Sequence, residues 1–176
     1  MAVCSSGAIL AGDTSDAQAE AMLAAMGDLG DKTVVFSCNW GAYSAVEAAG
    51  VQRLAYDPSV RLIRMMCAGR VHEGLLLRAF AQGAARVLVL ACGHEGEVSQ
   101  CHYYAGDDQA GNDRAGNDQA AHAVTQVRQL MGLLGIDPHR LALAEMQPGE
   151  GDRFVSAVEA FVKSAPEVVV QEHPKG

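Results

Sequence analysis

The sequence predicts an α/β fold: an open, doubly wound parallel sheet of about four to five strands, with helices on both faces, in a single domain. Short apolar runs rich in β-branched residues alternate with helix-length segments along the 176-residue chain. The runs are continuously apolar, as in strands buried on both faces of a parallel sheet. Hydrophobic residues make up 49% of the chain and aromatic residues only 5%, so we expect a sizeable aliphatic core.

The elements are predicted in chain order from these patterns. A first helix is expected over 15–27, capped by Asp13 or Thr14. Strands are predicted at 33–37, 60–66, 86–91 and 141–146, although LALAEM in the last could also be helical. Further helices are predicted at 42–50, 72–82, 123–134 and 153–164, with Gly50 and Gly83 as stops of the first two. The tail, which begins with VVV, could form a fifth strand or an arm laid on a partner.

Helical periodicity also predicts which side chains face the core. In the first helix these are Ala21, Met22, Ala25, Met26 and Leu29. In the helix at 123–134 they are Val124, Val127, Leu130, Met131 and Leu134.

The domain organisation follows from composition. We expect an N-terminal extension and helix at 1–30, the α/β domain at 31–164, and a tail at 165–176. Within the domain, a Gly-Asn/Asp-Asp-Gln/Arg-Ala unit occurs three times at a period of five between 105 and 121. Such a polar, glycine-rich tract is typical of a surface insertion.

Charge excludes several kinds of partner. The formal net charge is −8, whereas nucleic-acid binding depends on clustered Lys and Arg. An anionic membrane surface is disfavoured for the same reason.

We expect no membrane insertion, because no apolar run approaches the roughly 20 residues needed to span a bilayer. The start lacks the pattern of a signal peptide, so a cytoplasmic location is expected.

Three cysteines stand just after predicted strands: Cys38, Cys67 and Cys92. In a parallel sheet the carboxyl ends of the strands share one edge, where ligands bind. These thiols are therefore expected to meet, although they lie 29 and 25 positions apart in the chain. Cys101, from the loop after Cys92, makes a fourth candidate ligand. The sequence thus predicts a four-thiolate metal site.

The identity of the group is left open between two kinds of site. Structural zinc sites use close C-x(2–4)-C pairs, whereas the nearest pair here, Cys92 and Cys101, is separated by eight residues. Widely spaced ligands gathered by a sheet edge favour an iron–sulfur cluster. His94 and His102 could each replace a ligand, although a place in a loop is the simpler interpretation for both. A zinc-stabilised interaction module is the alternative.

Further interpretations concern a catalytic cysteine, two arginines and nucleotide binding. Cys92 with His94 or His102 could form a nucleophile and base, but this would leave the other strand-end cysteines unexplained. Arg64 and Arg70 lie beside the second strand end. Each is either solvated or paired with a carboxylate, or else stabilises a negatively charged cluster. Nucleotide binding has little support, because the chain lacks a Walker-type loop and a GxGxxG fingerprint.

Several motifs together resemble a known family. They are CNWGAYSA at Cys38, MMCAGR at 65–70 and CHY at Cys101, with PSVRLIR, FAQGAARVLVLAC, LLGIDPHRLAL and GEGDRF. Over 33–162 the chain is similar to the delta subunit of methyl-viologen-reducing hydrogenase. The resemblance implies a non-catalytic electron-transfer subunit with a 2Fe-2S cluster, held here by Cys38, Cys67, Cys92 and Cys101.

The resemblance also implies partners. Such a subunit receives electrons from a hydrogenase, a formate dehydrogenase or another redox subunit. It passes them to a heterodisulfide reductase A-like flavin and iron–sulfur subunit, where electrons are bifurcated, inside an oxygen-sensitive complex.

The chain departs from the family pattern in three places. Gly41 stands where the family usually has a second cysteine, in CNWC. The loop CGHEGEVSQCHY is longer than the usual CHPGDCHY, and the Gly-Asn-Asp tract resembles an insertion. A cluster-free subunit kept for assembly is a further alternative.

Overall fold

The computed structural model describes residues 15–95, 98–99 and 116–164. Its main sheet has four parallel strands in the order β2-β1-β3-β6. The bounds are β1 Thr33–Cys38, β2 Val60–Met65, β3 Arg86–Cys92 and β6 Leu141–Met146. The predicted fold class and its four strands are confirmed. The possible fifth strand falls in 165–176, outside the described residues.

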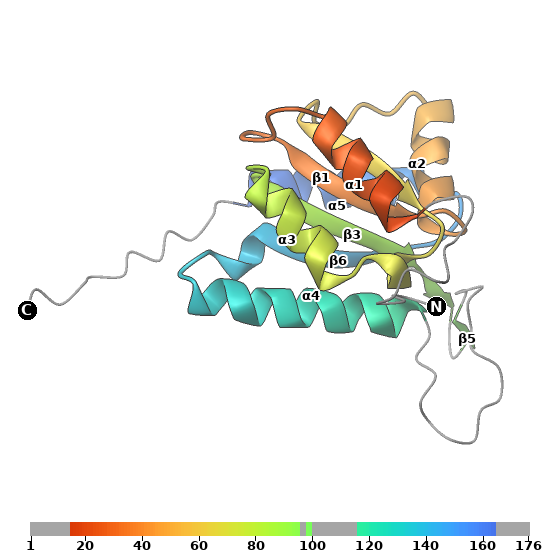
Figure 1. The fold of residues 1–176 in the computed structure, drawn as a ribbon. Helices are drawn as coiled ribbons and strands as arrows, with labels where there is room; N and C mark the ends of the chain where they lie inside the picture. The colour runs from red at the N-terminus through yellow and green to blue at the C-terminus, as the bar shows by residue number, and fades with distance from the viewer. Residues whose placement is uncertain (1–14, 96–97, 100–115, 165–176) are drawn as a thin grey trace, which may run out of the picture.

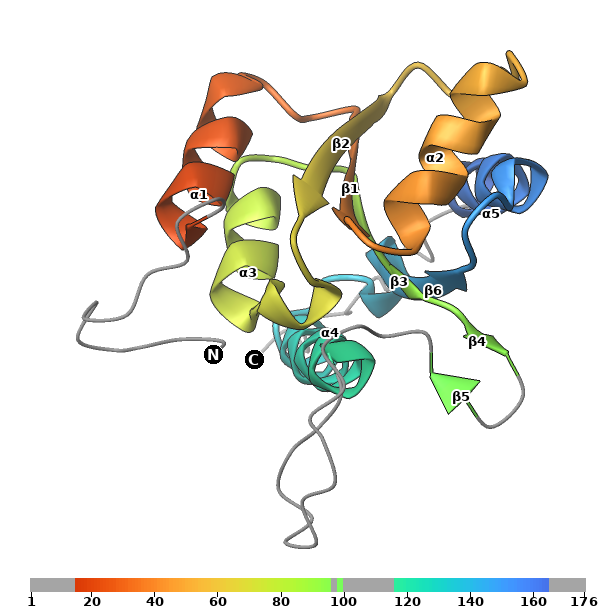
Figure 2. The ribbon, with the colours of Figure 1, turned by 90° about the vertical axis from the view of Figure 1, so that its right-hand side faces the viewer.

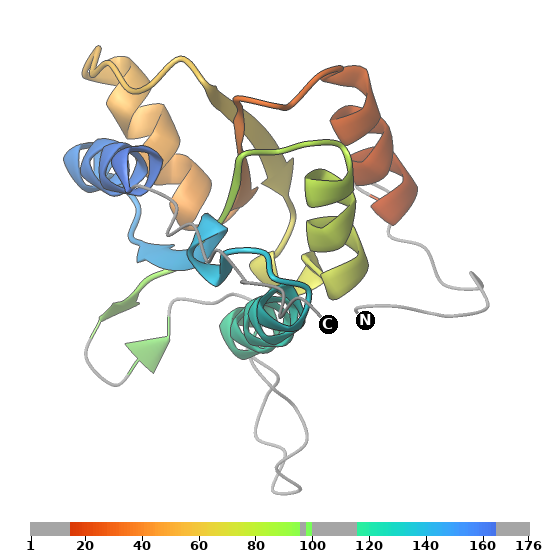
Figure 3. The same ribbon diagram turned by 90° about the vertical axis from the view of Figure 1, so that its left-hand side faces the viewer.

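Helices cover both faces of this sheet (Figure 1). Helices α2 (Ala42–Val51) and α5 (Gly151–Lys163) pack together on one face. On the other face lie α1 (Asp16–Ala25), α3 (Glu73–Ala81) and α4 (Gly116–Leu133). Figure 2 and Figure 3 show the two layers from opposite sides of the molecule. The result is a three-layer αβα sandwich.

The central strands carry the core. Every residue of β1 is buried, and in β3 all are buried except Arg86. Their side chains are Val, Leu, Phe, Ala and Cys for the most part, which suits strands covered on both faces. The edge strand β6 is half-buried in its middle, which explains its mixed sequence.

The order of the strands creates a switch point between β1 and β3. From β1 the chain moves outward to β2, then returns past β1 to β3 and continues to β6. In open α/β sheets, ligands bind beyond the carboxyl ends of the strands at the place where the order reverses. In this sheet β1 and β3 end in Cys38 and Cys92.

Several helix boundaries differ from the predictions. Ser15 caps α1 and forms a capping box with Gln18, so neither Asp13 nor Thr14 is the cap. Gly50 does not stop α2, which continues to Val51. Helix α4 begins at Gly116, so the last copy of the repeat is helical. The first turn of α4 packs against the short 3-10 helix Ala68–Arg70. Tertiary packing there outweighs the low helix propensity of Gly and Asn.

Two predicted helix faces need correction. In α1 the core side chains are Ala19 and Leu23, whereas the predicted Ala21, Met22 and Ala25 are exposed. Leu29, beyond the helix, is buried as predicted. In α4, Val124, Val127 and Met131 are buried as predicted, but Leu130 is exposed, as is Leu134 just beyond the helix. The buried stripe of α4 begins at Asn117 and continues through Ala120 and Ala123. Leu130 lies beside this stripe and is 39% exposed.

The sequence did not predict the antiparallel pair β4 (His94–Glu95) and β5 (Val98–Ser99). It extends from the end of β3, as Figure 2 shows. A second 3-10 helix, Pro138–Arg140, leads into β6. Across the described ranges, each helix is too short or too polar to traverse a bilayer.

Candidate metal centre

Cys38 and Cys92 meet at the switch point of the sheet. Their Sγ atoms are 3.3 Å apart, and both residues are 1% exposed. Cys38 is the last residue of β1 and Cys92 the last of β3, and these strands are neighbours. The predicted convergence of these two thiols is confirmed, and the sheet topology is its cause.

Cys67 joins them from the next strand. It follows β2 and immediately precedes the 3-10 helix Ala68–Arg70, where it is buried. Its thiol hydrogen bonds with Cys38. Three of the four predicted ligands therefore lie together, delivered by the ends of three adjacent strands.

The surroundings of Cys38 favour its thiolate. Hydrogen bonds with the Cys67 thiol, and next with the Cys92 thiol, lower the pKa of Cys38 to about 2. Backbone hydrogen bonds with Trp40 and Ala68 act in the same direction, against the opposing effect of burial. Thiolates are the form in which cysteine binds metal ions, so this group is prepared as a ligand.

The arrangement also bears on the thiol-enzyme interpretation. A nucleophilic cysteine must meet a substrate, so reactive cysteines are partly exposed. Cys38, Cys67 and Cys92 are all buried, and Cys38 contacts the other two. Such mutual contact suits ligands of one shared group better than a single nucleophile.

The fourth predicted ligand, Cys101, lies outside the described residues, as does His102. The side chain of His94 is not described either; its backbone belongs to β4. Within 15–95, 98–99 and 116–164, no three His, Cys, Asp or Glu side chains surround a common point that could hold one metal ion.

The two arginines near this edge have definite contacts. Arg70 forms an ion pair of 3.0 Å with Asp16 of α1, which agrees with the interpretation of an arginine paired with a carboxylate. Arg64 stacks over the ring of Tyr43 at 5.1 Å from its centroid.

Asn117 is a residue of this site that the sequence did not reveal. It is buried in the first turn of α4, and its Nδ2 donates to the carbonyl oxygen of Cys92 at 2.5 Å. Asn117 does not stand out in the sequence, because three similar Gly-Asn/Asp units make the tract resemble a uniform loop. The third unit, 116–120, forms the start of α4.

Comparison with known proteins decides the family. The model of the family described as methyl-viologen-reducing hydrogenase, delta subunit, matches residues 33–168, which include all four candidate ligands. The chain belongs to this delta-subunit family.

Two relatives are separate proteins of about the same extent. One is the D-type iron-sulfur subunit of the F420-non-reducing hydrogenase vhc of Methanococcus voltae, 35% identical over 72% of this chain and 78% of the relative. Another is the D-type iron-sulfur subunit of the F420-non-reducing hydrogenase vhu of Methanopyrus kandleri, 35% identical over 77% of this chain and 92% of the relative.

A third relative is much longer. It is the A-type subunit of the ferredoxin/F(420)H(2)-dependent CoB-CoM heterodisulfide reductase of Methanosarcina acetivorans. The identity is 32% over 77% of this chain, but the match spans only 15% of that protein's length. A delta-subunit-like segment therefore occurs inside a larger heterodisulfide reductase polypeptide.

Gly41 marks where this member departs from the delta-subunit pattern. A Cβ atom built on Gly41 would lie 3.2 Å from both Sγ and Cβ of Cys92. The position that carries a second cysteine in the usual pattern therefore adjoins the gathered thiols. Its neighbour Trp40 is 44% exposed, whereas Gly41 itself is buried.

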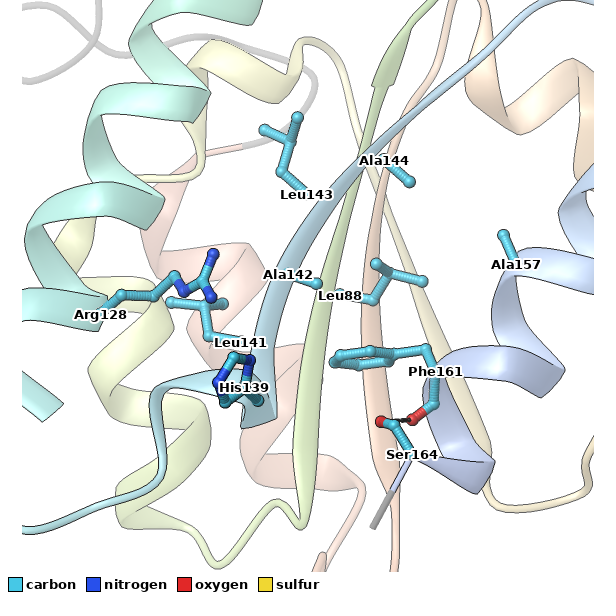
Figure 4. Close-up of a pocket in the computed structure, with 10 residues that line it drawn as sticks. All are labelled: Leu88, Arg128, His139, Leu141, Ala142, Leu143, Ala144, Ala157, Phe161 and Ser164. Atoms are coloured by element: carbon cyan, nitrogen blue, oxygen red, sulfur yellow. Dashed lines mark hydrogen bonds between the residues drawn. The ribbon is translucent and has the colours of Figure 1, made fainter. Parts of the chain in front are cut away.

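A separate groove runs along β6 between α4 and α5 (Figure 4). Its volume is about 690 Å³. Apolar side chains line most of it, including Leu143 of β6 and Phe161 of α5, and Arg128 and His139 add polar groups. The three described thiols are not among its lining residues, so the groove is not part of the metal centre.

Proposed function

We propose that this delta-subunit family member is an electron-transfer subunit that carries a 2Fe-2S cluster on Cys38, Cys67, Cys92 and Cys101. The observation that carries the proposal is the 3.3 Å approach of Cys38 and Cys92 at the switch point, with Cys67 beside Cys38. Four thiolates suit a 2Fe-2S cluster, and Cys101 follows Cys92 closely enough in sequence to supply the fourth.

The residues present fit such a group. Burial excludes water from the thiols, and the hydrogen bonds around Cys38 favour its deprotonated form. When bound, the cluster would accept and release single electrons; the protein would set its potential through hydrogen bonds, burial and nearby charge. The names of the two separate relatives, both of them iron-sulfur subunits, support the same assignment.

We further propose that the chain relays electrons between two other subunits of a cytoplasmic complex. The donor would be a hydrogenase, formate dehydrogenase or similar redox subunit, as the hydrogenase names of the separate relatives suggest. The acceptor would be a heterodisulfide reductase A-like subunit, where bifurcation takes place. The fused relative supports this acceptor, because it combines the two kinds of segment in one polypeptide.

Metal analysis of anaerobically purified protein tests the cluster. We expect about two irons and about two acid-labile sulfides per chain. Zinc without sulfide would show instead that the thiols form a structural zinc site. The acceptor is tested separately: the reduced protein is mixed with a purified heterodisulfide reductase A-like subunit, and its reoxidation is followed by absorbance. Reoxidation no faster than with an unrelated flavoprotein would reject the proposed acceptor.

A further inference from the structure

Asn117 connects three elements at the metal centre. Its side chain, 4% exposed, lies in the first turn of α4. Its Nδ2 donates to the carbonyl oxygen of Cys92 at 2.5 Å and lies 3.4 Å from Oε1 of Glu145 in β6. A carbonyl and a carboxylate can only accept, so the nitrogen of the amide must face them. The contact is therefore a directed hydrogen bond from α4 to the end of β3.

The peptide unit after Cys92 is held at both of its polar atoms. The carbonyl oxygen of Cys92 accepts from Asn117, and the N–H of Gly93 donates to the carbonyl oxygen of Met146 at 2.8 Å. These two atoms belong to one planar peptide group and point to opposite sides of the strand end. Rotation of this group would break both bonds, so the backbone that positions the Cys92 thiol is fixed from α4 and from β6.

The start of α4 is also fastened on the Cys67 side. A Cβ atom on Gly69 would lie only 2.8 Å from Cα of Gly116 and 2.9 Å from its carbonyl oxygen. The two backbones therefore touch, and Gly69 belongs to the turn that follows Cys67. The N-terminal end of this 18-residue helix, which carries a partial positive charge, is thereby packed against the segments that hold two of the thiols.

We propose that Asn117 is a positioning residue of the metal centre, because it fixes the Cys92 end of β3 to the first turn of α4. It thereby influences how firmly the thiolate site holds its cluster and at what potential the cluster is reduced. That influence rests on the proposed function; the fixing of the Cys92–Gly93 peptide does not. Removing the amide donor leaves the buried carbonyl of Cys92 without this bond and frees the peptide to rotate. Hydrogen bonds to the ligating side chains of metal sites are commonly worth about 10- to 100-fold in metal affinity, which serves as the order-of-magnitude guide for this backbone contact.

Two variants and one control separate this role from simple packing. Asn117→Leu keeps a similar volume without a donor, and Asn117→Asp keeps the shape but places a carboxylate toward Glu145. Gln129→Leu makes the same chemical change as the first at an exposed position of the same helix. We expect both Asn117 variants to release iron to a chelator about 10- to 100-fold faster than wild type. We expect their reduction potentials to fall, more for Asn117→Asp, while Gln129→Leu behaves as wild type.

A packing role would lower the unfolding midpoint of Asn117→Leu but leave the reduction potential and the EPR spectrum unchanged, and that result would overturn the proposal. Asn117→Asp serves the same comparison if the leucine variant does not fold.

The metal-free protein gives a readout independent of the cluster. There, Asn117→Leu should speed hydrogen exchange of the Gly93 amide at least about tenfold over wild type. Unchanged exchange at Gly93 would overturn the positioning role. If the wild type held no iron and no sulfide, yet exchange at Gly93 still increased in the variant, the proposed function would fail while the fixing of the Cys92–Gly93 peptide would stand.

Discussion

The Sγ atoms of Cys38 and Cys92 lie 3.3 Å apart, although the residues are 54 positions apart in the chain. Two neighbouring parallel strands bring them together, because each cysteine is the last residue of its strand. The contact lies where the strand order reverses, the place at which open α/β sheets bind their ligands. The approach of these two thiols is therefore a consequence of the topology and of where cysteine stands at the end of each strand.

The first prediction concerns the ligand set. Cys38→Ser, Cys67→Ser and Cys92→Ser should each reduce the iron and sulfide content of anaerobically purified protein strongly, because a hydroxyl is a poor substitute for a thiolate ligand. Cys4→Ser makes the same change in the N-terminal extension, outside the predicted ligand set, so it is the control and should leave that content unchanged. If Cys4→Ser removed the iron while Cys67→Ser retained it, the ligand set would be wrong.

The pH dependence of stability follows from the pKa of Cys38. Hydrogen bonding lowers this pKa to about 2 in the folded protein, whereas the pKa of a cysteine thiol in an unfolded chain is about 8.5. Between these values the unfolded state binds more protons, so the free energy of unfolding rises with pH. The contribution is fully present above the unfolded pKa and is lost as pH falls toward the folded pKa.

We therefore expect the metal-free, reduced protein to be more stable to urea at about pH 9 than at about pH 6. Cys38→Ser should show a smaller difference between the two pH values. An equal difference in wild type and variant would contradict the lowered pKa of Cys38.

The backbone of Gly69 touches that of Gly116, so adding one methyl group at Gly69 is expected to lower the stability of the protein. Gly69→Ala would place a Cβ 2.8 Å from Cα of Gly116, so we expect a loss of about 1–3 kcal/mol in the free energy of unfolding. Gly50→Ala is the matched control: Gly50 lies inside α2, and a Cβ there meets nothing within 4 Å. It should gain about 0.5–1 kcal/mol. Urea unfolding checks both, and a neutral Gly69→Ala would show that α4 does not pack tightly on this turn.

The position of Gly41 predicts a rescue. A Cβ there would lie 3.2 Å from Sγ of Cys92, so a thiol at this position would join the gathered ligands after a shift of a few tenths of an ångström. We expect Cys101→Ser to lose most of its iron and the double variant Gly41→Cys/Cys101→Ser to regain it, as measured by iron content per chain. A double variant with no more iron than Cys101→Ser would mean that position 41 cannot supply a ligand.

The sheet was predictable because its strands are short apolar runs with clear ends. The convergence of Cys38, Cys67 and Cys92 then followed from parallel strands sharing one edge. β6 was less certain from LALAEM alone, since Leu, Ala, Glu and Met all favour helices; pairing with β3 decides it. Gly41 was recognised as a departure from the family pattern, but its contact with Cys92 required coordinates.

Features that depend on tertiary packing were missed. The helical start at Gly116 contradicts local propensity, and contact with the turn after Cys67 explains it. Leu130 is exposed because the buried stripe of α4 passes through Val127 and Met131 beside it, and Leu134 lies just beyond the end of the helix. The sequence does not indicate that Asn117 is buried at this site, because a single polar residue leaves no hydrophobic periodicity. Its role depends on the Cys92 carbonyl, which lies 25 positions earlier in the chain.

EPR of the reduced protein tests the central claim, a redox-active 2Fe-2S cluster, most directly. The anaerobic protein is titrated with dithionite while its spectrum is recorded, and the spins are counted against the protein concentration. We predict an iron–sulfur signal that reaches about one unpaired electron per chain and disappears on reoxidation. A protein of full iron and sulfide content that takes up no electron, or one that holds zinc and gives no signal, would contradict the account.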